Sequence, residues 1–410
     1  MILDTMFAFT FKLFRAPRNR NLKRLVWIAH DIFNYFLGWQ RTRYSLGLPY
    51  MSFYEMSREF TSLRKSHPEI FSHWRELDSW AARRVLKRLD DGYQRFFKKI
   101  AKRPPKFRSW RNPYSFTMGP SGFEFADPEE GDLGFGIYGD KVRIMKRHYR
   151  FNLSRPILGN IKTVAVKEDG LGDFYMSVVT DHIATESTPK TGKAAGYDFG
   201  IKTLFTCSDG TQRESPHFYS TSHADLKSAQ QRHSSKVKGS HNRERERLNT
   251  ARVHRKIRRQ REDHHWKLAK SLVHQHDILC FETLCFEGMK RLWGRKVSDI
   301  APYGFHQKLQ HQAKKHGKQL CYIDRFEPTS KTCSTCGQPQ MFMDLSVRYW
   351  RCQGCKTNHH RDVNAAVNIL KVGTSTFGLE GVRLALASNP RRLHPKSIPH
   401  NPTAKQTDSL

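Results

Sequence analysis

The sequence has little negative charge and lacks any long apolar run. Of its 410 residues, 38 are Asp or Glu and 71 are Lys or Arg, so the formal net charge is +33. A helix that crosses a bilayer needs about 20 consecutive apolar residues, and the chain is therefore not expected to be an integral membrane protein. The apolar stretch near the N-terminus is short and is interrupted by Lys12, so a secretory signal is not expected either.

The excess of positive charge indicates a polyanionic partner. An apolar fraction of 38% and an aromatic fraction of 12% exclude a disordered basic tail, and the length allows roughly two to four folded domains. Lys and Arg clusters bind nucleic acid by releasing the counterions of its phosphates. A membrane surface is the alternative, but it requires one basic amphipathic helix or a polybasic tail. Because the charge here is spread through the chain, nucleic acid is favoured.

Cysteine is also scarce, and half of it falls in one pattern. Four of the eight cysteines form two Cys-x2-Cys pairs separated by 15 residues: Cys333, Cys336, Cys352 and Cys355. This spacing is typical of a tetrahedral zinc site of four thiolates, with two redox pairs as the alternative. A disulfide framework is not expected in a chain of this length. The others are interpreted as small core residues: Cys207, Cys280, Cys285 and Cys321.

The first half of the chain reads as strand, helices and strands. Alternating apolar residues predict a strand over 7–14, and apolar residues at spacings of three and four predict helices over 20–104, with a capping box at Ser52 and Glu55. Residues 106–185 then read as the short strands of a small barrel or sandwich, to which the first strand could belong, and a polar linker follows at 186–193.

The second half mixes strands with basic helices. Strands are predicted over 194–199, 203–207, 211–214, 278–282 and 319–324. Helices are predicted over 225–275 as one long basic stretch, over 304–316, and from residue 362 onward. The cysteine module occupies about 329–356, and the C-terminal tail from 372 to 410 is expected to be loosely ordered.

Three acids stand where a carboxylate is costly unless a cation neutralises it. Asp198 and Glu282 lie at or near the ends of apolar strands, and Asp362 starts a helix. If they converge, they could bind Mg²⁺, which prefers oxygen ligands, and two such ions could support phosphodiester hydrolysis. Taken singly, each acid is better explained by a surface loop or a helix cap, and only the combination with the order of elements, the cysteine module and the charge of +33 favours catalysis. The spacing alone does not establish that the three acids meet.

Four segments in order resemble motifs of the TnpB (OrfB) proteins of insertion sequences. Residues 196–202 (Gly-Tyr-Asp-Phe-Gly-Ile-Lys) resemble the first RuvC motif, and 281–284 (Phe-Glu-Thr-Leu) the second. Residues 328–337 resemble the first zinc knuckle with its Ser-Lys-Thr lead-in, and 360–366 (His-Arg-Asp-Val-Asn-Ala-Ala) the third RuvC motif. The order of these motifs makes the resemblance specific.

The N-terminal resemblance is weaker. Phe96-Phe97 followed by 105–108 (Pro-Lys-Phe-Arg) is similar to the family's join between helical and barrel domains, so the resemblance covers 7 to about 371. The sequence departs from the family at His360 and Val363, where acids are frequent. Neither position is a metal ligand in the family pattern, so the two differences are expected to adjust the activity and not to abolish it.

The resemblance implies a multidomain α+β architecture. It comprises an RNase H-like (RuvC) α/β nuclease domain with a zinc-ribbon insert that binds target nucleic acid, and a β-barrel wedge domain with an inserted helical recognition domain. The implied boundaries are 1–15 and 105–190 for the wedge barrel, 16–104 for the recognition domain, 191–328 and 357–371 for the RuvC-like domain, 329–356 for the insert, and 372–410 for a flexible tail.

It further implies an RNA-guided DNA endonuclease related to type V CRISPR effectors. Such an enzyme hydrolyses DNA phosphodiesters with Mg²⁺ next to a short adjacent motif, while a guide RNA encoded near the gene reads the rest of the double-stranded target. Asp198, Glu282 and Asp362 would then hold two Mg²⁺ ions, and the four paired cysteines one structural Zn²⁺. A cytoplasmic, nucleoid-associated location in a prokaryote is expected, and the sequence does not decide between monomer and dimer.

Basic residues on the helices, at the domain join and in the zinc motif are the candidates for RNA or DNA contacts. They are Arg84, Lys87, Arg88, Lys106, Arg108, Lys202, Arg252, Arg255, Arg258, Arg259 and Lys331.

Three other functions stay open at this point. Relatives that have lost catalytic acids act as RNA-guided DNA-binding repressors, but all three acids are present here. A guide-free RuvC-like nuclease would not need the basic helices, the zinc insert or the N-terminal region. A zinc-ribbon regulator would leave the acids unexplained.

Overall fold

The computed structural model divides the chain into two compact units. The first comprises Met1–Ala184 and Val237–Arg252, and the second Thr185–Lys236 and Val253–Leu410. The residues described are 7–109, 115–119, 135–145, 147–182, 188–200, 203–341, 343–344, 346–376 and 383–384. Within these ranges no helix is long and apolar enough to cross a membrane.

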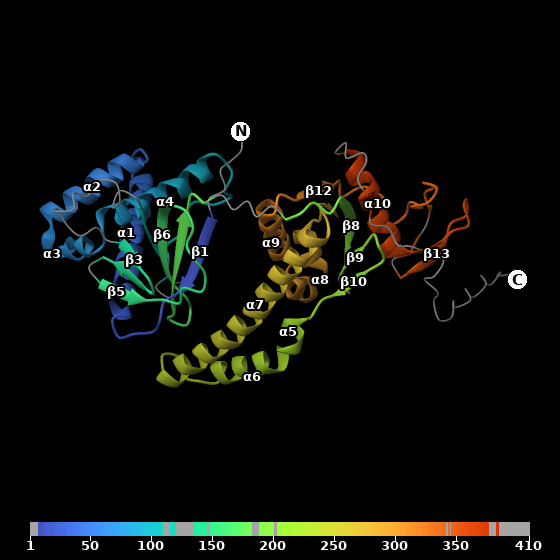
Figure 1. Cartoon of the computed structure of the whole chain (residues 1–410). Helices are drawn as coiled ribbons and strands as arrows, with labels where there is room; N and C mark the ends of the chain where they lie inside the picture. Colours follow the sequence, from blue (N-terminus) through green and yellow to red (C-terminus); the bar gives the residue numbers. More distant parts are fainter. Residues whose placement is uncertain are drawn as a thin grey trace, which may run out of the picture. The chain divides into compact units, whose positions relative to one another are not determined.

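Two antiparallel sheets share one core in the first unit (Figure 1). The larger has the order β1-β7-β6-β2, and the smaller β3-β4-β5. The bounds are β1 Phe7–Lys12, β2 Ser115–Met118, β3 Phe135–Tyr138, β4 Lys141–Ile144, β5 Arg147–Arg150, β6 Ile161–Glu168 and β7 Phe174–Thr180. An isolated bridge between Leu13 and Phe151 links the sheets. The N-terminal strand therefore belongs to this sheet, as its alternation allowed, and the described pairings form a sandwich.

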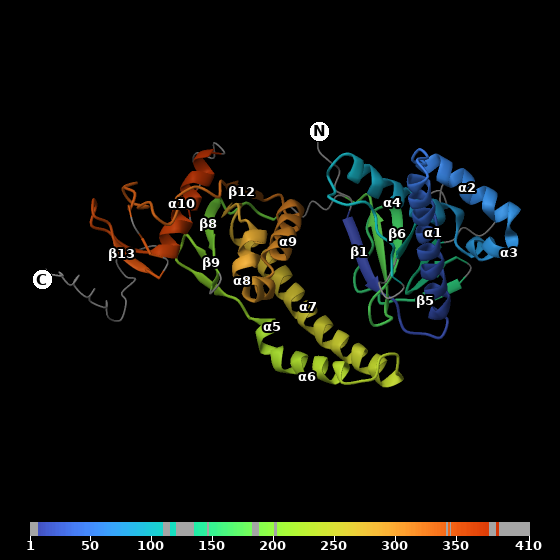
Figure 2. The same cartoon turned by 180° about the vertical axis from the view of Figure 1, so that it is seen from behind.

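The helices inserted after β1 pack on the larger sheet. They are α1 Asn19–Ser45, α2 Phe53–Ser66, α3 Pro68–Phe71, the 3₁₀ helix η1 Ser72–Glu76 and α4 Ser79–Phe97. Both α1 and α4 contact β2, and α1 also contacts β6 (Figure 2). Trp74 is fully buried among aromatic rings. The predicted capping box is confirmed, because Glu55 N donates to Ser52 Oγ and Ser52 N to Glu55 Oε2.

The second unit is built on a mixed sheet of six strands, in the order β10-β9-β8-β11-β12 with β15 also paired to β8. The strands are β8 Lys193–Phe199, β9 Thr203–Cys207, β10 Gln212–Glu214, β11 Ile278–Glu282, β12 Gln319–Ile323 and β15 Arg383–Leu384. Strands β8, β11 and β12 run parallel, so their carboxyl ends meet at one edge of the sheet.

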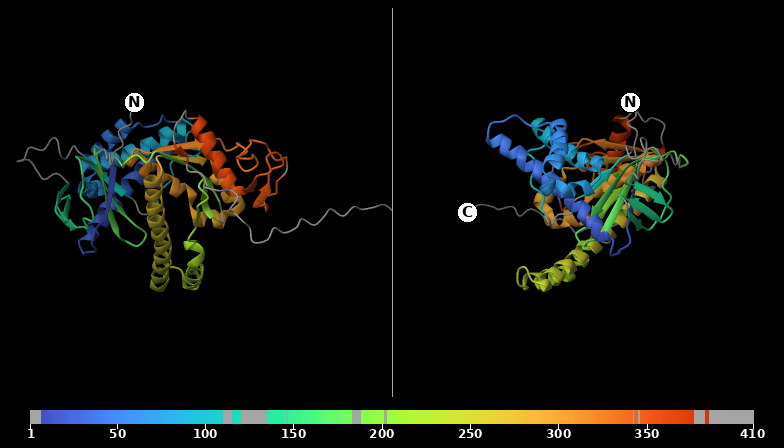
Figure 3. Two further views of the ribbon diagram at one scale, coloured as in Figure 1. Left: turned by 45° about the vertical axis from the view of Figure 1, so that its right-hand side comes forward. Right: turned by 90° about the vertical axis from the view of Figure 1, so that its left-hand side faces the viewer.

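Helices cover both faces of this sheet, which explains why its strands β9 and β11 are mostly buried. The helices are α5 Phe218–Thr221, α6 His223–Ser234, α7 His241–Gln275, α8 Phe286–Ile300, α9 Pro302–Lys315 and α10 Arg361–Thr376. One face, which includes Tyr197 and Phe281, packs against the C-terminal part of α7 and against α8 and α9. The other, which includes Ala194 and Cys280, packs against α10. The left view of Figure 3 shows α7 as one continuous helix.

Three expectations about the second half are corrected. The basic stretch 225–275 is two helices, because 235–240 leaves helical geometry and Gly239 takes a φ of +91°. Helix α8, between two predicted elements, was not expected. The last helix continues to Thr376, and 383–384 pairs with β8, so the described residues beyond 371 do not form a loose tail. The rest of that segment lies outside the described residues.

A small module separates β12 from α10. It holds the paired cysteines and a two-stranded sheet, β13 Tyr349–Arg351 with β14 Asn358–His360. Its last strand leads directly into α10, so the module and the helix share a rigid junction.

Candidate active site and cysteine cluster

Asp198 and Glu282 lie on neighbouring parallel strands and on the same face of the sheet. Gly196 of β8 is paired with Cys280 of β11, and each acid follows its paired residue by two positions. Side chains two positions apart on a strand share a face. That face is the one that packs against α10.

Asp362 lies in the first turn of α10, which packs tightly on this face. A Cβ atom on Gly196 would lie 2.1 Å from the carbonyl oxygen of Ala366 and 2.7 Å from the nitrogen of Leu370. Only a residue without a side chain allows the helix to lie this close. The approach brings the start of α10 toward the acids at the strand ends.

The electrostatics of Asp198 show that the three acids are neighbours. Its pKa is raised to about 8, first by burial and then by the negative charges of Asp362 and Glu282. Burial also raises the pKa of Glu282. Like charges held together disfavour one another's ionised form unless a cation is added. The donor set, carboxylate oxygens only, fits a hard divalent cation such as Mg²⁺.

An arginine that the sequence analysis missed contacts this group. Arg348 Nη1 lies 2.8 Å from Asp362 Oδ1 and 3.2 Å from Oδ2. Arg348 and Arg361 both act to lower the pKa of Asp198, against the larger opposing effects. Arg348 precedes β13 in a loop with no recognisable motif, so no sequence signal marked it.

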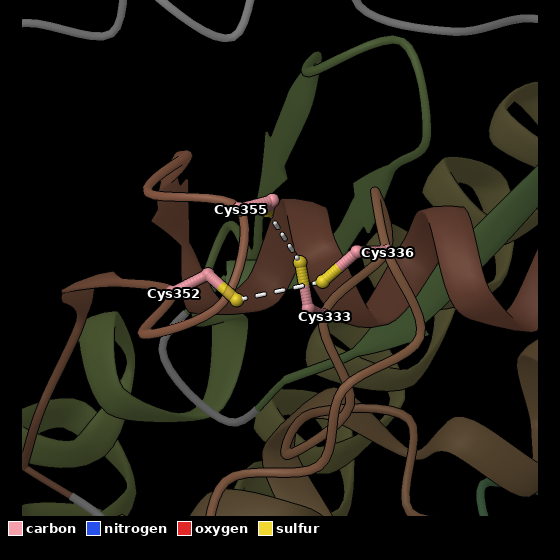
Figure 4. A group of neighbouring side chains, drawn as sticks. All are labelled: Cys333, Cys336, Cys352 and Cys355. Atoms are coloured by element: carbon pink, nitrogen blue, oxygen red, sulfur yellow. Dashed lines mark hydrogen bonds between the residues drawn. The ribbon is translucent and has the colours of Figure 1, made fainter.

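The four paired cysteines converge, as their spacing predicted (Figure 4). Their sulfurs all lie within 4.8 Å of one another, with Cys333 and Cys355 at 3.6 Å and Cys336 and Cys352 at 3.6 Å. Zn–S bonds of about 2.3 Å in a tetrahedron put sulfurs about 3.8 Å apart, so the cluster fits zinc. Among the described residues this is the one group of possible ligand atoms gathered so tightly; the three acids are near one another but more widely spaced.

Neighbouring groups shape the cluster. His359 Nε2 lies 3.1 Å from Cys333 Sγ, and the His359 ring packs against Trp350 in a tilted arrangement with 4.6 Å between centroids. A hydrogen bond with the Thr357 hydroxyl lowers the pKa of Cys355 to about 6, which favours the thiolate that binds metal. His359 was also missed, because a histidine four residues after a cysteine has no fixed meaning by itself.

Helix α10 connects the acids with the cysteine cluster. Asn364 Nδ2 donates to Thr332 O at 2.8 Å, and Asn364 Oδ1 accepts from Ser334 N at 2.8 Å. One turn later, Asn368 Nδ2 donates to Thr329 O at 2.7 Å. Helix α10 therefore carries Asp362 at its start and anchors the first cysteine knuckle along its side.

The predicted basic contacts fall into distinct groups. Arg84, Lys106, Arg108, Arg252, Arg258, Arg259 and Lys331 have exposed side chains, and Arg255 is half-buried. Lys87 instead pairs with Asp90 at 2.9 Å, and Arg88 donates to Ser115 O at 3.1 Å, so these two bind within the fold. Lys202 lies outside the described residues.

Two known families match the chain. The OrfB_IS605 family, described as "Probable transposase", matches residues 174–292. The family described as "Cas12f1-like, TNB domain" matches residues 303–369. The second match contains the cysteine module and the start of α10.

Curated relatives cover most of the chain. A "Putative RNA-guided DNA endonuclease" of Streptomyces pristinaespiralis is 30% identical over 336 residues, 81% of each chain. The "Putative RNA-guided DNA endonuclease InsQ" of Escherichia coli K12 is 25% identical over 386 residues, covering 89% of this chain and 92% of InsQ. A match of this extent reaches both units.

Solved structures share the fold at low identity. The Cas12f1–sgRNA–target DNA complex matches with a TM-score of 0.51 at 14% identity, covering 87% of this chain and 83% of that one. The mini-RNA-guided endonuclease CRISPR-Cas phi3 matches with a TM-score of 0.51 at 10% identity, covering 90% and 92%.

Proposed function

The chain belongs to the TnpB (OrfB) family, and from that premise we propose that it is an RNA-guided DNA endonuclease of an insertion sequence. The relatives that match over most of its length carry that name. The observation that supports cleavage is that Asp198 and Glu282 lie at the ends of neighbouring parallel strands, and that Glu282 and Asp362 both raise the pKa of Asp198. A protein that only bound DNA would have no need for acids whose charges disfavour one another there.

In this proposal Asp198, Glu282 and Asp362 hold Mg²⁺. When bound, the ion supplies positive charge that stabilises the phosphodiester as negative charge develops on it. The chain's own contribution is placement: two parallel strand ends fix Asp198 and Glu282, and α10 fixes Asp362. Arg348 is close enough to share this site, and a guanidinium binds phosphate oxygens in two parallel hydrogen bonds.

The cysteine module has a structural role in this proposal. Zn²⁺ held by Cys333, Cys336, Cys352 and Cys355 would fix the loop that carries Arg348 and the strand that leads into Asp362. A closed four-thiolate site contributes folding energy and leaves no position for a substrate.

The first unit would act as wedge and recognition domains. Its sandwich would be the wedge, its helices the recognition domain, and together they would bind guide RNA and the duplex next to the target. Base pairing with the guide would read the remaining sequence. Of the exposed basic residues named above, Arg84, Lys106, Arg108 and Arg252 lie in this unit and are the candidates for these contacts.

The proposal is tested by separating cutting from binding. The protein is expressed with the DNA that flanks its gene, the co-purifying RNA is sequenced, and binding and cleavage of a matching duplex are measured. Asp198→Ala is expected to abolish cutting while target binding stays within about twofold. Glu214→Ala, an exposed acid on the edge strand β10, is the control and should cut normally.

Each other result points to a different function. A wild-type protein that binds the guided target with Mg²⁺ and never cuts would be an RNA-guided repressor. Cutting without any discrete RNA would indicate a guide-free nuclease and would overturn the proposal. If Asp198→Ala cuts at the wild-type rate, the three acids do not take part in cleavage.

A further inference from the structure

A cationic cavity lies in the first unit, far along the chain from the acids. Its volume is about 410 Å³, within the range of about 300–1,000 Å³ typical of small-ligand pockets. It lies between the segment that joins β1 to α1 and the strand β5. Five of its lining residues matter here: Phe14, Arg15, Arg18, Tyr149 and Arg150.

Backbone contacts make the cavity a fixed feature. Phe14 N donates to Arg150 O at 2.8 Å, which holds the joining segment beside β5. Arg18 Nη1 donates to His148 O at 2.9 Å, which ties the start of α1 to the same strand. Tyr149 is 2% exposed and packs in the core. The lining is thus preorganised, which reduces the entropy cost of binding a ligand.

The charge of the lining favours an anion. Arg15 Nε lies 2.6 Å from Asp173 Oδ1, and Lys12 Nζ lies 3.0 Å from Asp173 Oδ2. Arg150 pairs with Asp140 at 2.9 Å. Three of the lining residues are arginines and none is acidic, so the lining is positively charged although Arg15 and Arg150 each pair with a carboxylate outside it. The ion pairs also fix the directions of two guanidinium groups.

One further feature points to a nucleotide and not to a bare phosphate. Phe14 lines the cavity and is 53% exposed, so its ring is open to stacking. A base can stack on a phenylalanine ring, which a bare phosphate cannot do.

We infer that this cavity binds one unstacked nucleotide of single-stranded RNA, with its phosphate on Arg15, Arg18 and Arg150 and its base on Phe14. Bases in a duplex are stacked and cannot enter a cavity, whereas RNA loops and ends present splayed bases. The inference rests on the proposed function, which supplies an RNA partner. It goes further because it assigns a specific contact and its residues.

The test measures affinity for two probes, a transcript of the DNA that flanks the gene and single-stranded U12. Phe14→Ala should weaken U12 binding about tenfold, since stacking on one aromatic ring carries much of a base's affinity. The variant removes no charge, so the slope of log K against log salt should stay unchanged. Phe14→Trp should restore binding. Arg18→Ala should weaken binding and reduce the salt slope by about 0.7, the loss of one phosphate contact.

Arg58→Ala is the matched control, because Arg58 is an exposed arginine on α2 outside the cavity. Thermal melting checks that each variant is folded. The inference would be overturned if Phe14→Ala and Arg18→Ala both bound U12 with wild-type affinity. It would also be overturned if Arg58→Ala lost as much affinity as they do. A loss seen with duplex DNA and not with U12 would overturn it as well.

The two probes separate this inference from the proposed function. If U12 binding depends on Phe14 and the flanking transcript does not bind, the cavity is supported as a binding site and the guide RNA is rejected. If the transcript binds tightly and its affinity does not change in Phe14→Ala or Arg18→Ala, the guide RNA is supported and the cavity is rejected as a binding site. Binding of neither probe by the wild type would overturn both.

Discussion

Cys336 tests the zinc site at the scale of one residue. Its sulfur lies 3.6 Å from that of Cys352 within the four-cysteine cluster. Cys336→Ser removes a thiolate, so we expect zinc content to fall well below one ion per chain and the melting temperature to drop, because metal binding and folding of such a module are coupled. Elemental analysis and thermal melting measure this. Cys285, which was expected in the core, is exposed and lies outside the cluster, so Cys285→Ser should keep both values. An unchanged zinc content in Cys336→Ser would contradict the site.

Gly196 tests the close approach of α10 to the sheet. Its missing side chain leaves the room that the carbonyl oxygen of Ala366 occupies. Gly196→Ala should lower the free energy of unfolding by about 1–3 kcal/mol or more, the usual cost of forcing atoms into a packed core. Denaturant unfolding measures the change.

The control for that experiment is Gly294→Ala. Gly294 lies inside α8, and a Cβ there meets no atom within 4 Å. Alanine in an open helix position is expected to be neutral or to stabilise by about 0.5–1 kcal/mol. Equal stability of the two variants would mean that α10 can shift freely, and the placement of Asp362 would lose its physical basis.

The sequence predicted some of these residues and not others, for a physical reason. A carboxylate at the end of an apolar strand, such as Asp198, and four cysteines at fixed spacing are local signals. Arg348 and His359 gain their roles from partners 14 and 26 residues away, Asp362 and Cys333. One arginine among 71 basic residues carries no local mark of such a contact.

At the scale of elements, an exposed aromatic residue follows the end of β12, the strand that is paired with the strand of Glu282. The last residue of β12, Ile323, is paired with Glu282, and Thr283 N donates to Ile323 O at 3.1 Å. Phe326 follows three residues later, with its ring 77% exposed and the Arg325 guanidinium 4.4 Å from the ring centroid. A hydrogen bond from Phe326 N to Asp324 Oδ1 at 2.7 Å fixes the turn.

This placement predicts that Phe326 stacks on a base of the strand being cut. Phe326→Ala should lower the rate of target cleavage about tenfold, with an unchanged melting temperature, because base stacking on an aromatic ring contributes substantially to single-strand binding. Phe326→Tyr keeps the ring and should cut at nearly the wild-type rate. Equal cleavage rates for the alanine variant and the wild type would show that the ring does not contact the substrate.

Helices and strands were predictable where the apolar pattern was strong. They were not predictable where a uniform composition gave no sign that a helix ends. The strands 203–207 and 278–282 are mostly apolar and were predicted correctly. The boundary between α6 and α7 lies in a uniformly basic stretch, where no change of periodicity marks it. Helix α8 follows a short loop whose N-cap, Cys285, makes no side-chain cap, so the usual start signal was missing.

At the scale of the whole molecule, the charge of +33 governs how the protein meets nucleic acid. Most of the basic residues named as candidates are exposed, and few acids offset them. Such a surface attracts any nucleic acid, so charge alone supplies affinity without sequence preference. In the proposed function, specificity then comes from pairing with the guide.

The salt dependence of binding tests this division. With Asp198→Ala used to prevent cutting, affinity for a non-matching duplex should fall along a straight line of log K against log salt, with a slope of about −0.9 for each neutralised phosphate. If the protein contacts six to ten phosphates, the affinity should fall about 10³- to 10⁵-fold between 50 and 200 mM salt. A matched target with its guide should lose affinity along a similar slope but from a higher starting value, since base pairing adds a contribution that releases no counterions from the protein surface. A flat line for the non-matching duplex would mean that the basic residues are neutralised within the complex, by guide RNA above all, and that the excess charge serves RNA binding and not the DNA target.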